Sequence, residues 1–78
     1  MWYLLAMTVT VPAVQIDVDK LKALRRERVL SIRELANAAG VNRNTVYNLE
    51  HGSGNAHART IRKLASALDI EPRELIRR

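Results

Sequence analysis

Apolar side chains recur three or four residues apart through most of the chain after residue 16, which is the spacing of one buried helix face. Residues that start and stop helices divide this pattern into five short predicted helices. Ser31 with Glu34 forms a capping box before the second helix, and Gly40 supplies the left-handed residue that ends it. Asp17 and Asn42 are the predicted N-caps of the first and third helices. The inward-facing positions are Leu21 and Leu24 in the first predicted helix, Leu35, Ala36 and Ala39 in the second, Val46 and Leu49 in the third, Ile61, Leu64, Ala65 and Leu68 in the fourth, and Leu75 and Ile76 in the fifth, where Pro72 occupies the first turn.

The first 16 residues follow a different pattern and contain no charged side chain. Thr8–Val11 alternates polar and apolar residues, as a half-buried strand does, and the alternation resumes at Val14 and Ile16. Pro12 interrupts the segment and allows only an edge strand or a break there. The pattern therefore predicts an extended segment ahead of the helices.

We accordingly divide the chain into an N-terminal extended or β-strand arm, residues 1–16, and an all-α, five-helix domain, residues 17–78. A single uncharged strand is an aggregation hazard, and the chain offers no second convincing strand to pair with it. Pairing with another subunit is one interpretation. The alternatives are that the arm folds back on the helices, or that the chain begins at Met7. The residues predicted for a dimer arm are Trp2, Tyr3, Leu4, Val9 and Val11.

Composition narrows the class of protein. The chain has 78 residues, enough for one domain with a modest core, and its formal net charge is +5. A basic surface suits a polyanionic partner, although it is also common on proteins that bind no nucleic acid. The absence of cysteine excludes disulfides and thiolate metal sites, and two histidines are too few for a zinc site without carboxylate ligands. No apolar run is long enough for a membrane span, and the N-terminus lacks the basic start of a secretory signal, so we expect a cytoplasmic protein.

No nucleophile–base pair, carboxylate pair or metal-ligand set occurs at usable spacing, so we predict neither an enzyme nor a cofactor. The segment from Ser31 to Glu50 instead predicts two short helices joined by a tight turn through Gly40. Glycine reaches the positive φ of such a turn without steric cost, and Ala36 is small where the two helices must cross closely. The second helix then projects its outer face into solvent, where it can enter the major groove of duplex DNA.

The outer face of that second helix carries side chains suited to DNA, because arginine forks onto guanine and asparagine pairs with adenine. We predict that Arg43 reads a base, with a phosphate contact as the alternative, and that Asn44 and Asn48 contact either bases or phosphates. Tyr47 lies along a sugar–phosphate strand or packs against the following loop. The full set predicted for DNA binding is Arg43, Asn44, Asn48, Tyr47, Thr45, Asn42, Ser31 and Arg33.

A longer set of residues carries a family resemblance, namely Leu24, Arg25, Leu30, Ser31, Glu34, Leu35, Ala36, Gly40, Val41, Asn44, Thr45, Val46, Leu49, Glu50, Gly52, Thr60, Ile61, Lys63, Leu64, Ala65, Ala67, Leu68 and Leu75. With these residues, the chain from Leu21 to Ile76 resembles the Xre family of helix-turn-helix regulators, the fold of phage repressor and Cro proteins. The resemblance implies a phage-repressor-like domain that binds double-stranded DNA. It also implies a structural ion pair between Arg25 and Glu50 that fixes the recognition helix, whereas the alternative is two unrelated surface charges.

Two positions depart from the family's pattern. Ile32 stands where many members carry a glutamine that contacts a phosphate. Ser31, Arg33 and nearby backbone N–H groups could make this contact instead, because helix N-termini bind phosphates. The loop over residues 53–57 lacks the proline that often ends it in the family, so we expect a more mobile loop.

The prediction that follows is a sequence-specific transcription regulator, a repressor, that binds duplex DNA as a homodimer on a two-fold site. The alternative is an antitoxin-type or other protein-interaction module, because the uncharged arm could bind a toxin instead of a second copy. Regulation rests on the resemblance alone.

Overall fold

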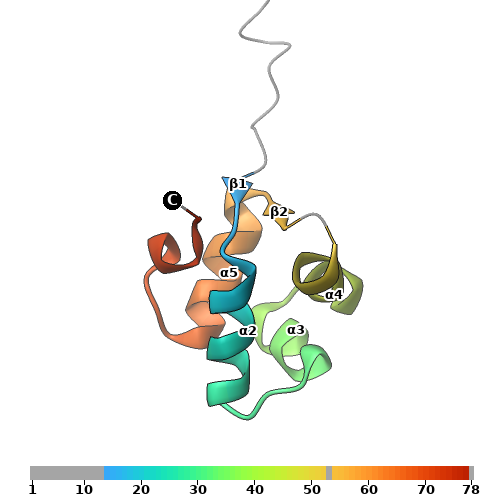
Figure 1. Ribbon diagram of the computed structural model, residues 1–78. Helices are drawn as coiled ribbons and strands as arrows, with labels where there is room; N and C mark the ends of the chain where they lie inside the picture. Colours follow the sequence, from blue (N-terminus) through green and yellow to red (C-terminus); the bar gives the residue numbers. More distant parts are fainter. Residues whose placement is uncertain (1–13, 53, 78) are drawn as a thin grey trace, which may run out of the picture.

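The computed structural model describes residues 14–52 and 54–77. In chain order its elements are β1 (Val14–Gln15), α2 (Val18–Glu27), α3 (Ile32–Ala39), α4 (Arg43–His51), β2 (Asn55–Ala56), α5 (Ala58–Leu68) and the 3-10 helix η1 (Pro72–Leu75) (Figure 1). The described part of the chain thus has four α-helices, and the predicted number of five is wrong. The last predicted helix stops after one 3-10 turn, because Ile76 is extended and bridges Ile16 in an antiparallel pair.

Helices α2, α3 and α4 begin where the local sequence predicts. Asp17 Oδ1 accepts a hydrogen bond from Lys20 N–H at 3.1 Å, and Asn42 caps α4 through the backbone N–H two residues on, at 2.7 Å. The capping box of α3 is complete: Glu34 N–H donates to Ser31 Oγ at 3.0 Å, and Ser31 N–H donates to Glu34 Oε1 at 2.9 Å. The predicted N-caps are confirmed.

Three helices end in one hydrogen-bonded motif that requires a left-handed residue. That residue is Gly40 after α3, with φ 70°, Asp69 after α5, with φ 57°, and Val29 after α2, with φ 55°. At the end of α2, the N–H groups of Val29 and Leu30 donate to carbonyls of the last turn at 2.9 and 3.1 Å. Glycine adopts this conformation freely and aspartate tolerates it, whereas a β-branched valine does so at a steric cost.

The hydrophobic core lies where α2, α3, α4 and α5 meet, with α3 packed against both α4 and α5. Small side chains on α3, Ala36 and Ala39, allow these neighbours to approach closely. Leu24 and Ile76 are half-buried against the core, and every other predicted inward position is buried. The buried apolar residues of the described chain are Ile16, Leu21, Leu35, Ala36, Ala39, Val46, Leu49, Ala56, Ile61, Leu64, Ala65, Leu68 and Leu75.

A short antiparallel ladder attaches the start of the described chain to the helices. β1 pairs with β2, with Val14 opposite Ala56. Directly after β1, Ile16 donates its N–H to Gly54 O at 2.8 Å, and its side chain is buried in the core. The expectation that the chain offers no partner strand is therefore wrong for β1, because the loop before α5 is extended and exposes backbone groups that can pair.

Charged residues begin at Asp17, but packing into the hydrophobic core begins earlier, because Ile16 is already a core residue. The residues predicted for the dimer arm, Trp2, Tyr3, Leu4, Val9 and Val11, lie outside the described residues. Over residues 14–52 and 54–77, no helix has the length and apolar character needed to cross a bilayer.

Candidate nucleic-acid interface

Helix α4 has one face in the core and the other in solvent. Val46 and Leu49 anchor the inner face, with exposed fractions of 0% and 3%. The outer face begins at the first residue of the helix and occupies its first two turns. Its exposed side chains are Arg43, Asn44, Tyr47 and Asn48. All four are residues predicted for DNA binding, and the packing of α4 turns them away from the core.

An ion pair between Arg25 of α2 and Glu50 of α4 fixes the end of α4. Arg25 Nε donates to Glu50 Oε2 at 2.7 Å and Nη2 donates to Oε1 at 2.9 Å, while Nη1 donates to Leu30 O at 2.8 Å. The Glu50 side chain is 1% exposed and that of Arg25 is 13% exposed. The hydrogen bonds that Arg25 donates to Glu50 raise the pKa of Arg25 above its ordinary value, so the guanidinium stays charged. The ion pair that the resemblance implied is present, and it ties α4 to α2.

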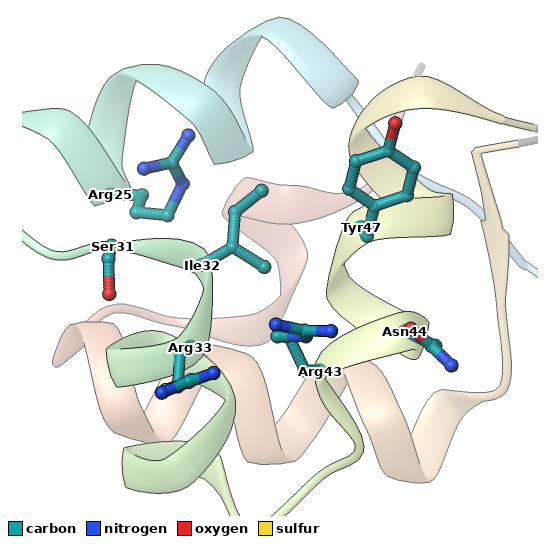
Figure 2. Close-up of a pocket in the computed structure, with 7 residues that line it drawn as sticks. All are labelled: Arg25, Ser31, Ile32, Arg33, Arg43, Asn44 and Tyr47. Carbon is teal, nitrogen blue, oxygen red and sulfur yellow. The ribbon is translucent and has the colours of Figure 1, made fainter.

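The first turns of α3 and α4 border a hollow of about 860 Å³ on the outer side of α4 (Figure 2). Its lining residues are Arg25, Ser31, Ile32, Arg33, Arg43, Asn44 and Tyr47. Five of the eight residues predicted for DNA binding thus share one concave surface. Ile32 lies among them, although the sequence marked it only as a departure from the family's pattern. The sequence signal that could have identified Ile32 is an isoleucine at the first position of a short, capped helix.

The other three residues predicted for DNA binding lie outside this hollow. Asn42 is exposed, and its side chain caps α4. Thr45 is half-buried. Together with Asn48 it lines a smaller hollow that faces the start of α5, near His57 and Thr60. Thr45 and Asn48 therefore lie on the side of α4 that faces α5.

Sequence reasoning missed one contact on the outer face of α4. The rings of Tyr47 and His51 stack, with centroids 4.4 Å apart and planes at 27°. His51 Nδ1 lies 3.1 Å from Tyr47 O, and because a carbonyl oxygen only accepts, the hydrogen of this bond is on Nδ1. The four-residue spacing that places both rings on adjacent turns was visible in the sequence. The contact holds the half-exposed ring of Tyr47 from one side.

The chemistry of this surface is that of an interface for a polyanion. Arg33 and Arg43 are exposed, and within the described residues neither forms an ion pair. Their guanidinium groups can bind phosphate oxygens or base edges, while the amides of Asn44 and Asn48 can donate to and accept from bases. In the same part of the chain, no group of three or more His, Asp or Glu side chains is placed to hold a metal ion.

Comparison with known proteins identifies the family. A model of the helix-turn-helix family matches residues 21–75. Among solved structures, the chain is similar to the restriction-modification controller protein C.AhdI from Aeromonas hydrophila, with 44% identity and a TM-score of 0.70 over 76% of this chain and 89% of that chain. It is also similar to a mutant of hydroxyethylphosphonate dioxygenase, with 25% identity and a TM-score of 0.72 over 82% of this chain. No curated protein matches the chain.

These likenesses differ in what they cover. The match to the dioxygenase spans only 14% of that chain, so the two proteins share a helical module and no more is implied. The family model, in contrast, spans more than half of this chain and includes α3, the turn at Gly40 and α4. The chain therefore belongs to the Xre-type helix-turn-helix family of DNA-binding transcription regulators.

Proposed function

We propose that this protein is a sequence-specific transcription regulator that reads the major groove with α4 and represses its target as a homodimer on a two-fold site. The observation that carries the proposal is the exposed polar face of α4, held rigidly by Val46 and Leu49 in the core and by the buried Arg25–Glu50 pair. Rigid presentation matters because base reading requires donors and acceptors at fixed positions.

Within this proposal, the side chains at the start of α4 and those at the start of α3 have different roles in recognition. Arg43, at the start of α4, reads a guanine, and Asn44 and Asn48 contact bases or the neighbouring backbone. Ser31 and Arg33, at the start of α3, bind a phosphate, which sets the position of α4 in the groove. Base contacts by Arg43, Asn44 and Asn48 carry sequence information, whereas phosphate contacts carry none.

The likeness to C.AhdI supports a narrower proposal, that the regulated genes belong to a restriction-modification system. The 44% identity extends over 89% of that controller chain, so it includes the whole helix-turn-helix unit rather than one motif. Repression follows if the dimer occupies DNA that the polymerase needs. A dimer also doubles the bases read, since one recognition helix contacts only a few base pairs.

The experiment that tests the proposal is selection of bound sequences from a random duplex pool, with the mass of the complex recorded. We expect a two-fold motif with half-sites about one helical turn apart and two chains per duplex. Arg43→Ala should weaken binding to the selected site by roughly 1–3 kcal/mol and relax one base position. Arg73→Ala removes the same charge from η1, across the molecule from α4 in Figure 1, and should leave the motif unchanged.

Other outcomes of the selection have definite meanings. An equal loss of affinity for every sequence in Arg43→Ala would assign Arg43 to a phosphate. The absence of any enriched motif would refute DNA reading and favour a protein partner such as a toxin. Affinity should also fall steeply with salt, because bound counterions are released from the phosphates. An affinity that does not change with salt concentration would contradict phosphate binding by this surface.

Dimer formation through the arm is tested by deleting residues 1–11. This deletion keeps β1 and Ile16, which pair with β2 and fill the core. We expect folded helices, a monomeric mass in sedimentation and weaker binding to the selected site. An unchanged mass would show that the arm does not hold the dimer together.

A further inference from the structure

The hollow at the start of α3 and α4 has an apolar wall that phosphate binding and guanine reading leave unused. Ile32, the first residue of α3, is half-buried, and Tyr47 of α4 is 53% exposed. Both line the hollow that also contains Arg33 and Arg43 (Figure 2). The wall therefore combines apolar surface with two guanidinium groups that form no ion pair within the described residues.

The start of α3 does not require an isoleucine at position 32. The capping box uses the backbone and side chains of Ser31 and Glu34, which leaves the side chain of Ile32 without a role in the cap. Ile32 packs partly against the core, but part of its surface remains in the hollow. A branched apolar side chain in this place presents methyl groups beside the reading face.

Tyr47 is held in place before any ligand binds. Its ring stacks on that of His51 at 4.4 Å, and His51 Nδ1 donates to Tyr47 O at 3.1 Å. A ring that is already restrained loses less conformational entropy on binding. Ile32 and the restrained ring of Tyr47 thus come from different helices and line the same hollow as Arg43.

One apolar group projects into the major groove of duplex DNA, the methyl group on C5 of thymine, and 5-methylcytosine carries the same group at the same position. The charge of the hollow matches a nucleic acid, and Arg43 beside it suits the O6 and N7 acceptors of guanine. We propose that Ile32 and Tyr47 form a seat for the C5-methyl group of a pyrimidine that neighbours the guanine contacted by Arg43. This inference rests on the proposed DNA-reading function and assigns a specificity role to Ile32.

The test uses the full chain and the duplex obtained by selection. Each thymine next to a guanine in the half-site is replaced by deoxyuridine, which removes only the methyl group. Each cytosine next to a guanine is replaced by 5-methylcytosine, which adds a methyl group. At one position we expect uracil to weaken binding about fourfold, the equivalent of one buried methyl group, or 5-methylcytosine to strengthen it about fourfold. The first result identifies thymine as the source of the methyl group, and the second identifies 5-methylcytosine.

Variants of Ile32 connect this effect to the hollow. Ile32→Gln should abolish the difference between methylated and unmethylated duplexes, while Ile32→Val should retain it, because valine keeps branched methyl groups at the same place. The ratio of the two affinities is unaffected by the fraction of each variant that is folded, so a loss of stability cannot imitate the result.

The inference and the proposed function fail in different ways. If the selection yields a motif but no methyl group changes affinity at any pyrimidine beside a guanine, the seat does not exist, although DNA reading stands. The same conclusion follows if Ile32→Gln preserves the ratio. If the selection yields no motif, the proposed function is refuted and the seat with it.

Discussion

Val29 occupies the left-handed position that ends α2, with φ 55°, and its side chain is 86% exposed. At the equivalent positions after α3 and α5 the chain has Gly40 and Asp69, which accept this conformation more readily. The hydrogen bonds of the motif come from backbone N–H groups, so they do not depend on the valine side chain. Replacing Val29 should therefore remove backbone strain and leave the turn intact.

The size of the effect follows from three contributions. A residue with a Cβ in the left-handed region costs roughly 1–2 kcal/mol. Because Val29 is 86% exposed, its removal gives up only about 0.3 kcal/mol of burial. Glycine gains entropy in the unfolded chain, which offsets about 0.4–1 kcal/mol of the relief. We expect Val29→Gly to raise the free energy of unfolding by about 0.5 kcal/mol. Val29→Asn keeps a Cβ, but its side chain can hydrogen-bond locally in this conformation and it lacks the entropy penalty of glycine, so we expect a rise of similar size, about 0.5 kcal/mol.

Urea titration followed by circular dichroism measures the change, with the m-value as a check that the unfolding transition is comparable. In a domain of this size, about 1 kcal/mol corresponds to a rise in Tm of roughly 4–8 °C. Val29→Ala keeps the Cβ in the left-handed region and serves as the control, with a smaller gain than either replacement. A loss of stability in both Val29→Gly and Val29→Asn would refute the reasoning, because it would mean that the valine side chain contributes more than its backbone costs.

Two further predictions concern the ion pair and the capping box. Glu50→Ala leaves the Arg25 charge unpaired where its side chain is only 13% exposed, and should lower the free energy of unfolding by roughly 3–5 kcal/mol in urea titration. The paired replacement Arg25→Met with Glu50→Leu should recover most of that loss, and an equal loss in the paired variant would contradict the role of the unpaired charge. In the capping box, the hydrogen bond from Ser31 N–H holds the pKa of Glu34 below its ordinary value of 4.5, so the contribution is complete above that pH and is lost as the pH falls through the lower value of the folded state. The difference in Tm between the protein and Glu34→Gln should therefore shrink on acidification, and a difference that stays constant would contradict the assignment.

Local sequence patterns predicted part of the candidate site. The outward direction of Arg43 and Asn44 was predictable, because Val46 and Leu49 fix the inner face of the same short helix. The hollow was not predictable, because Ile32 and Tyr47 come from different helices and meet only through the angle at which α3 and α4 cross. The partners of the ion pair, 25 residues apart, came from a family resemblance and not from spacing.

Local sequence patterns set the start of α2, α3 and α4, the left-handed turn at Gly40 and the division of each helix into inner and outer faces. These features depend on interactions within one or two helical turns, so the residues that decide them are neighbours in the chain. Long-range packing, in contrast, causes β1 to pair with β2, Ile16 to enter the core, and the last helix to stop after one turn so that Ile76 can bridge Ile16. These features depend on segments some 40 to 60 residues apart, whose backbone groups come together only once the helices have packed.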